Sequence, residues 1–92
     1  MRKVLSMDVY KKNGQRDVTY MISEFMSDYD HIFYFQEFRP EKNNNTAFKW
    51  ADEFYTMTEA EEHFEVVKKK HEALGDKVVV QDWYTREIRS WT

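Results

Sequence analysis

The sequence predicts an α+β domain in which one amphipathic helix packs on one face of a mostly antiparallel sheet of four to five strands. Three observations support this prediction. The 92 residues fit a single domain, the N-terminal segments alternate apolar and polar side chains at the period of a strand, and one later segment repeats apolar residues at helical spacing. Sixteen aromatic residues also favour strands over a helical bundle. We therefore expect residues 1–92 to fold as one two-layer domain.

A β-hairpin is predicted over residues 3–11 and 16–25. Asn13-Gly14 tolerates the positive φ angles of a two-residue type I′ turn. Folding the chain about this dipeptide pairs apolar residues on one face: Val9 with Val18, Met7 with Tyr20 and Leu5 with Ile22. The opposite face receives the polar residues Ser6, Asp8, Asp17, Thr19 and Ser23. A shift of one residue would expose the whole apolar set, so this pattern determines the register.

Two further strands are predicted after a turn at residues 27–30, where short polar side chains can hydrogen-bond to their own backbone. Residues 31–38 are rich in aromatic residues and apolar on both faces, which predicts a strand that is central or covered on both sides. A polar loop precedes the fourth strand, which is expected over residues 47–57. An alternative interpretation makes residues 23–30 one helical turn.

The helix is predicted over residues 58–75. Thr58 and Glu61 have the spacing of a capping box, and Gly75 stands where a left-handed C-terminal residue belongs. Apolar positions recur every three or four residues and form one stripe: Ala60, Phe64, Val67, His71 and Leu74. A last strand opens at residues 78–80 and can continue toward Trp91.

The aromatic residues exceed what one helix can cover. A helix of about 17 residues is roughly 25 Å long, which is too short to hide both faces of the predicted sheet. Some aromatic side chains should therefore form an exposed apolar patch or a subunit interface. The candidates are Phe33, Phe35, Phe48, Trp50, Phe54, Trp83 and Trp91. We expect a homodimer, because a two-fold pair is the commonest symmetric assembly.

The composition excludes several classes of protein. The absence of cysteine excludes disulfides, thiolate metal sites and a thiol nucleophile. Two glycines are too few for a phosphate-binding loop or a dinucleotide fingerprint. No apolar run reaches the roughly 18 residues of a membrane span, and the N-terminus lacks the apolar stretch of a signal peptide. We therefore expect a cytoplasmic protein that binds no membrane and needs no cofactor.

Candidate catalytic and metal-binding residues are few. His63 and His71 are eight residues apart, which is not the spacing that lets two imidazoles share a zinc ion. Glu59 and His63 have a suitable spacing, but the sequence indicates no third ligand. A small ribonuclease site could be assembled from His31, Tyr34 and Arg86, although only the presence of these residues favours it. We expect neither an enzyme nor a metal protein.

The order of charges along the chain is more informative than any motif. The net charge of −3 conceals two stretches without Lys or Arg, residues 17–38 and 50–67. Their carboxylates are the predicted partner-binding residues: Asp17, Glu24, Asp28, Asp30, Glu37, Asp52, Glu53, Glu59 and Glu62. If both stretches converge on one face, they can occupy the Lys and Arg side chains with which a partner grips phosphates. The alternative is an ordinary solvated surface, in which acidic residues complement the helix dipole.

A very small, cysteine-free, aromatic-rich α+β protein with rows of carboxylates resembles the DNA-mimic inhibitors that phages make against restriction nucleases and other host DNA-binding proteins. The similarity lies in size, composition and charge layout. It implies a non-enzymatic anti-restriction inhibitor whose acidic surface binds a host nuclease or another DNA-binding protein in the host cytoplasm, with no direct contact to nucleic acid. A homodimer would join two acidic faces into a longer strip.

Two alternatives remain open. One is a small nucleic-acid-binding module that combines aromatic stacking with the basic residues of the first hairpin, namely Lys3, Lys11, Lys12 and Arg16. The other is a structural or assembly subunit without a separate activity. The sign of the charge beside the exposed aromatic residues distinguishes the inhibitor from the nucleic-acid-binding module.

Overall fold

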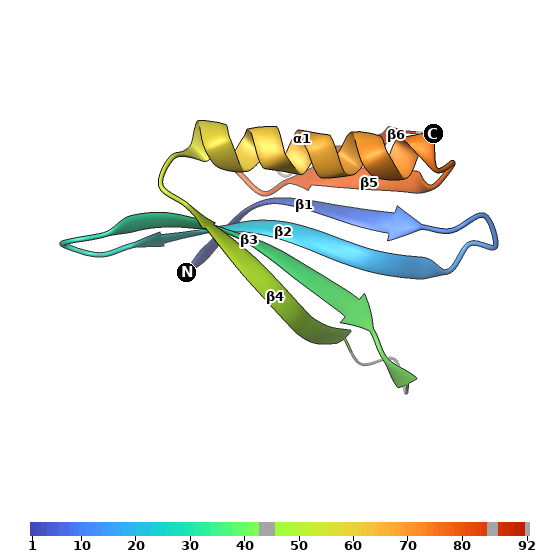
Figure 1. The fold of residues 1–92 in the computed structure, drawn as a ribbon, viewed down its shortest axis with the longest axis horizontal. Coiled ribbons are helices and arrows are strands. Elements are labelled where there is room, and N and C mark those ends of the chain that lie inside the picture. Colours follow the sequence, from blue (N-terminus) through green and yellow to red (C-terminus); the bar gives the residue numbers. More distant parts are fainter. Residues whose placement is uncertain (43–45, 85–86, 92) are drawn as a thin grey trace.

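A computed structural model describes residues 1–42, 46–84 and 87–91, and within them an antiparallel sheet carries one helix on one face (Figure 1). The strands are β1 (Arg2–Tyr10), β2 (Arg16–Met26), β3 (His31–Pro40), β4 (Thr46–Phe54), β5 (Lys77–Asp82) and β6 (Glu87–Trp91). The helix α1 (Met57–Ala73) lies between β4 and β5 in the chain. The strands are ordered β4-β3-β2-β1-β5-β6, and every neighbouring pair is antiparallel. The predicted α+β class is confirmed.

The C-terminal segment forms two strands where the alternation predicted one continuous strand. β5 ends at Asp82, whose carboxylate accepts a hydrogen bond from the backbone N–H of Tyr84 at 3.0 Å. Such a bond stabilises a turn, because a short acidic side chain satisfies the backbone two residues on. The chain then returns as β6 beside β5, so the sheet has one strand more than predicted.

The predicted register of the first hairpin is confirmed, but the type of its turn was predicted wrongly. Lys11 donates its backbone N–H to the carbonyl of Gln15 at 2.9 Å, and Gly14 donates to the carbonyl of Lys11 at 2.9 Å. Gly14 has a φ of +84°. This is a three-residue loop with a left-handed glycine, not a two-residue type I′ turn. Tyr10 pairs with Arg16, so Asp17 forms a bulge that turns it away from its predicted face.

The core lies between α1 and the face of the sheet that α1 covers. It contains Met7, Val9, Val18, Ile22, Phe35, Ala60, Phe64 and Val78, all at most 2% exposed. Phe33 and Phe35, two candidates for the exposed patch, belong to this core, and the ring centroids of Phe35 and Phe64 are 6.4 Å apart. They are covered because odd-numbered residues of β3 face α1. The opposite face of the sheet has no helix over it (Figure 1).

Other aromatic candidates do reach the surface. Phe48 is 55% exposed and Trp50 is 40% exposed, on the edge strand β4. Phe48 pairs with Phe38 on the face that α1 does not cover, whereas Trp50 lies on the α1 side of the sheet, where the β3–β4 pair twists away from the helix (Figure 1). Phe54 and Trp83 are partly buried, and the side chain of Trp91 lies outside the described residues. β4 ends at Phe54, three residues earlier than predicted.

The N-terminus of α1 also differs from the prediction. Thr56, not Thr58, caps the helix, because its hydroxyl accepts the backbone N–H of Glu59 at 3.2 Å. The two threonines are two residues apart, and both have a glutamate three residues further on. The capping-box pattern therefore fits either start.

The C-terminus of α1 has the predicted left-handed glycine. Gly75 has a φ of +83° and donates its N–H to the carbonyl of Glu72 at 3.0 Å, while the N–H of Asp76 reaches the carbonyl of His71 at 3.1 Å. These two bonds form a Schellman motif. Leu74 is 62% exposed, so its predicted place in the apolar stripe is wrong. It is the C-cap residue, where the chain already turns out of the helix.

The turn at residues 27–30 is confirmed by hydrogen bonds from the backbone N–H groups of Tyr29 and Asp30 to the hydroxyl of Ser27, at 3.3 and 3.0 Å. β2 continues to Met26, so the alternative helical turn over residues 23–30 is not formed. Within the described part of the chain, no helix has the length and apolar character needed to span a membrane.

Candidate functional site

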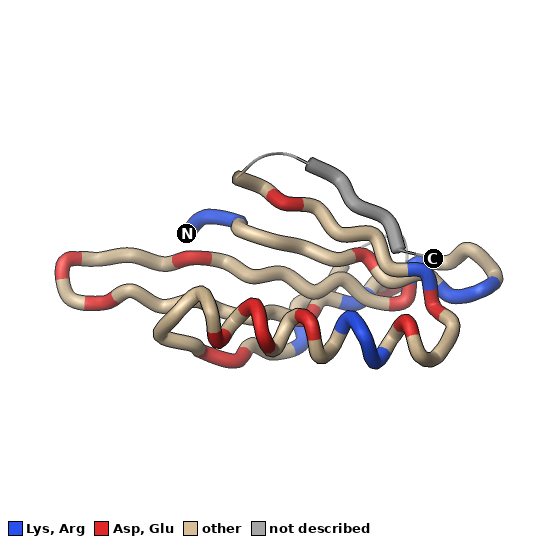
Figure 2. Tube along the Cα trace, turned by 90° about the horizontal axis from the view of Figure 1, so that it is seen from above, with Lys and Arg blue, Asp and Glu red and all other residues tan. Residues whose placement is uncertain are grey.

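Six of the nine predicted partner-binding carboxylates belong to segments that meet at one end of the molecule. This end holds the β2–β3 turn, the last residues of β4 and the first turns of α1. Other Lys and Arg lie toward the β1–β2 loop, but the basic start of β1 also lies near this end, where Arg2 pairs with Glu24 (Figure 2). The six are Asp28, Asp30, Asp52, Glu53, Glu59 and Glu62. They do not form one flat face, because Asp52 pairs with Phe35 on the α1 side and Glu53 pairs with Tyr34 on the other.

The other three carboxylates have intramolecular partners. Asp17 and Glu37 both contact Arg39, at 3.5 and 3.1 Å. Glu24 contacts Nε2 of His31 at 2.7 Å and accepts the Tyr84 hydroxyl at 2.9 Å. The hydrogen bond from His31 lowers the pKa of Glu24 below its ordinary value. Asp17 and Glu37 therefore share Arg39 away from the other six, whereas Glu24 lies near the acidic end, beside His31 at the start of β3.

A groove of about 500 Å³ crosses the open face of the sheet, which is the face that α1 does not cover. It is lined by Lys3, Ser6, Asp8, Arg16, Thr19, Met21, Phe38, Thr46, Gln81 and Trp83. Strand pairing explains why they meet. Ser6 lies opposite Met21 in β2 and Gln81 in β5, and cross-strand partners project to the same face.

Trp83 is held against one wall of this groove. Its indole N–H donates to the Ser6 hydroxyl at 2.9 Å, and its backbone N–H donates to the carbonyl of Val4 at 2.9 Å. Nζ of Lys3 lies 4.6 Å from the centroid of its ring, within the range of a cation–π contact. An aromatic ring and a cation are therefore fixed side by side.

The other wall has a second cation near aromatic rings. Nη2 of Arg16 donates to the hydroxyl of Thr46 at 3.1 Å. Phe38 lies in the same groove, with its ring centroid 5.7 Å from that of Phe48. Asp8 is the one carboxylate among the described residues that line the groove, and it accepts the Thr19 hydroxyl. Among the lining residues, two cations face one hydrogen-bonded carboxylate, so the local charge is positive.

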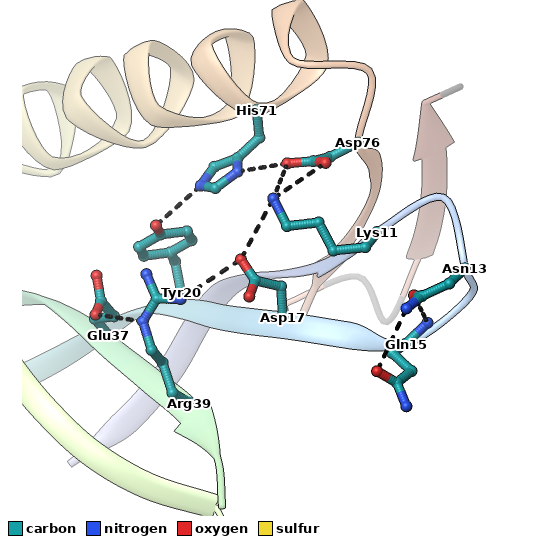
Figure 3. A network of polar contacts seen from close by, with 9 residues as sticks. All are labelled: Lys11, Asn13, Gln15, Asp17, Tyr20, Glu37, Arg39, His71 and Asp76. Carbon is teal, nitrogen blue, oxygen red and sulfur yellow. Dashed lines mark hydrogen bonds and ion pairs between the residues drawn. The ribbon is translucent and has the colours of Figure 1, made fainter.

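A polar network connects the end of α1 to the sheet (Figure 3). The Tyr20 hydroxyl is 3.0 Å from Nε2 of His71, Nδ1 of His71 is 3.0 Å from Asp76, and Nζ of Lys11 is 3.3 Å from Asp76. Burial, followed by the charge of Glu37, raises the pKa of the Tyr20 phenol. The network therefore links the end of α1 to the β1–β2 hairpin.

Of the residues considered for a ribonuclease, His31 and Tyr34 lie on opposite faces of β3. His31 lies on the α1 side of β3 and contacts Glu24. Tyr34 projects to the open face, since it is three positions along the same strand. Arg86 lies outside the described residues. His63 is 3.7 Å from Asp52, but the described side chains contain no group of three or more His, Asp or Glu placed to hold a metal ion.

Sequence reasoning placed Ser6, Asp8 and Thr19 on the correct face but did not identify a groove there. Met21 could have indicated the groove, because it is a large apolar residue on the same face of the hairpin as these polar residues. Gln81 and Trp83 could not be added from local patterns, because they join the groove through the β1–β5 pairing. No family model, curated protein or solved structure matches the chain.

Proposed function

We propose that the protein is a small non-enzymatic nucleic-acid-binding module that holds a single strand on the open face of its sheet. One observation carries this proposal: the aromatic rings of the groove lie beside cations. Lys3 contacts the ring of Trp83, and Arg16 lines the same groove as Phe38. Lys3 and Arg16 are two of the four basic residues that the sequence associates with such a module.

The groove can recognise both parts of a nucleotide. Bases stack on aromatic side chains, and each stacked base contributes about 1–3 kcal/mol to binding. Trp83 and Phe38 provide the rings, while Lys3 and Arg16 provide positive charge for phosphates. Thr19 and Gln81 add groups that hydrogen-bond to base edges, while the buried Ser6 holds Trp83 in place. A single strand fits this arrangement better than a duplex, because its bases are free to stack on protein side chains.

The net charge of −3 does not prevent this binding, because the acidic residues lie mainly elsewhere. The molecule is 45 Å long, and the Debye length at physiological salt is about 8 Å. Carboxylates that lie more than one Debye length from the groove are therefore largely screened from a ligand bound there. Two cations would neutralise about two phosphates, which predicts a shallow salt dependence with a logarithmic slope near −1.4 for a single strand.

The test is the affinity for a fluorescently labelled single-stranded oligonucleotide, measured by anisotropy at low salt. We expect Lys3→Gln and Arg16→Gln each to weaken binding and to flatten its salt dependence. Lys69→Gln, which changes an exposed lysine on α1, is the matched control and should bind as the unchanged protein does. Equal affinity in all three variants, or no binding by the unchanged protein, would overturn the proposal.

A second pair of variants tests the stacking. Trp83→Phe keeps an aromatic ring but loses the N–H bonded to Ser6, whereas Trp83→Ala removes the ring. We expect the phenylalanine variant to retain most of the affinity and the alanine variant to lose it, with circular dichroism confirming that both are folded. If both variants bind equally, the ring does not stack on a base.

The acidic inhibitor is the second candidate, and the gathering of six carboxylates at one end favours it. The segments that form this end carry no Lys or Arg. Its partner would be a host nuclease or another DNA-binding protein in the cytoplasm, and its dimer would extend the acidic strip. Reversing the charge of Asp28, Asp30, Asp52 and Glu53 should then weaken the complex progressively.

Competition distinguishes the two functions. An inhibitor that imitates DNA excludes DNA from its captured partner and itself has no affinity for DNA. If DNA and this protein bind the partner together, the inhibitor hypothesis is wrong. Direct binding of an oligonucleotide by the isolated chain supports the nucleic-acid-binding module instead.

A further inference from the structure

We propose that the pocket between the β1–β2 loop and the start of β5 binds the phosphate of a nucleotide. This inference extends the proposed function but depends on different residues. The pocket has a volume of about 450 Å³, which is within the usual range for small-molecule sites. Its lining includes Tyr10, Lys11, Lys12, Lys77 and Val79.

The charged side chains that line this pocket are positive. Among the described residues that line it, three are lysines and none is a carboxylate. Lys11 is held by Asp76, whose side chain is only 5% exposed and also contacts His71. Among the described residues, no ion pair involves Lys12 or Lys77. Their two ammonium groups are therefore available to an anion, and lysine is a common phosphate ligand.

Two left-handed glycines shape the pocket. Gly14 belongs to the hairpin loop, and Gly75 belongs to the Schellman motif that ends α1. Cε of Lys12 lies 3.1 Å from the position that a Cβ on residue 75 would occupy. A glycine there lets the stem of Lys12 lie across the end of the helix, which directs its ammonium group into the pocket. Lys12 is thus placed by its packing as well as by the loop.

The pocket continues from the groove on the open face. Tyr10 pairs with Lys77 on one side and with Arg16 on the other, so the three form one row across β5, β1 and β2. Tyr10 lines the phosphate pocket and shares an adjacent hollow with Arg16, which also lines the groove. A nucleotide with its phosphate at Lys12 and Lys77 therefore lies within reach of the ring of Tyr10.

Binding of adenosine monophosphate, adenosine and inorganic phosphate tests the pocket, with NMR shifts of residues 10–12 and 77 as the readout. We expect adenosine monophosphate to bind about tenfold more tightly than adenosine, since a charged contact is worth roughly that factor. A variant with both Lys12→Gln and Lys77→Gln should lose this advantage, while Lys69→Gln and Lys70→Gln together should keep it. Equal affinity for nucleotide and nucleoside, or an unchanged double variant, would overturn the inference.

Oligonucleotides with and without a 5′-phosphate identify the source of the nucleotide. A tighter complex with the phosphorylated strand, lost in the Lys12→Gln/Lys77→Gln variant, assigns the pocket to a strand end. Binding of adenosine monophosphate without that gain assigns it to free nucleotides. If the nucleotide binds but the unphosphorylated strand does not, the proposed single-strand function is wrong, while the phosphate pocket is still supported. If Lys3→Gln weakens strand binding but the Lys12→Gln/Lys77→Gln variant changes the affinity for neither the strand nor the nucleotide, only the phosphate pocket is wrong.

Discussion

His71 lies near the end of α1 with a partner on each ring nitrogen. Asp76, on the Nδ1 side, has a pKa below its ordinary value, chiefly because of this hydrogen bond and then because of Lys11. The carboxylate therefore accepts the proton of Nδ1, and in the neutral ring Nε2 accepts the hydroxyl of Tyr20. In a Schellman motif the residues at these two positions usually make an apolar contact. Here a hydrogen bond between His71 and Asp76 replaces it.

Replacing Asp76 by Asn should lower the free energy of unfolding by about 1–3 kcal/mol near pH 7, because His71 and Lys11 lose a charged acceptor. The folded pKa of Asp76 lies below the ordinary 3.8. Its contribution is therefore present above that value and is lost as the pH falls through the folded pKa. Urea unfolding near pH 7 and near pH 2 measures both effects. Asp28→Asn, at the exposed β2–β3 turn, is the control. A loss of unfolding free energy in Asp76→Asn that is the same at both pH values would contradict this account.

α1 has ends that are set by local hydrogen bonds and a middle that is set by packing. Thr56 and the Schellman motif satisfy backbone groups at the two ends. Between them Ala60 and Phe64 are at most 2% exposed and face the sheet. Lys68 is also buried along this side, and its Nζ is 3.5 Å from Glu65. A lysine can cover apolar surface with its stem, so the buried stripe of the helix is wider than its apolar residues indicate.

The two candidate caps of α1 can be separated by mutation. Thr56→Ala should cost about 1 kcal/mol, because the N–H of Glu59 loses its acceptor. Thr58→Ala should change stability by less than about 0.5 kcal/mol, since it is an exposed position within the first turn. Chemical unfolding measures both. The reverse order of effects would place the start of the helix at the position predicted from the sequence.

Packing of the middle of α1 is tested at Phe64. Phe64→Ala should cost about 3–5 kcal/mol, because it removes a ring that is 2% exposed. Val66→Ala is the matched control on the outer side of the helix, where the side chain is 65% exposed, and should cost less than about 0.5 kcal/mol. A loss below about 1 kcal/mol at Phe64 would mean that another face of the helix packs on the sheet.

The pattern of apolar and polar residues was sufficient to predict most helices and strands. It was insufficient where the same residues were compatible with two local structures. The alternation of Met7, Val9, Val18 and Tyr20 has one register that buries them all, so the hairpin could be predicted. The turn could not, because the dipeptide at Gly14 is compatible with loops of two or three residues. The helix cap was ambiguous for the same reason, since two threonines carry the same motif.

The whole molecule has charges that are distributed unevenly along its length. Acidic residues lie at the β2–β3 turn and along the first turns of α1, and basic residues lie toward the β1–β2 loop and at the N-terminus (Figure 2). The groove lies on the one face of the sheet that α1 leaves open. It could not be predicted, because it combines Trp83 with residues of β1 and β2 through a pairing between distant parts of the chain. The basic residues and the aromatic surplus could be read from composition, but their contact could not.

The exposed edge of the sheet at β4 bears on the oligomeric state. β4 is an edge strand that exposes Phe48 and Trp50, and an unpaired edge with large apolar side chains favours association. We expect light scattering at micromolar concentration to report a homodimer, and Trp50→Ser to shift it toward the monomer. A monomer at every concentration would instead make this strand available to a different partner.

β1 precedes the other strands of this sheet in the chain, yet it lies inside the sheet between β2 and β5. During synthesis β1 to β4 can pair in turn, since each strand lies beside the next one in the chain. The second edge of β1 stays open until β5 has left the ribosome, because Tyr10 pairs with Lys77 and Leu5 with Asp82. Closing so long a loop is slow. Until then one edge of β1 is unpaired, and β5 of another copy can pair with it and form a domain-swapped dimer.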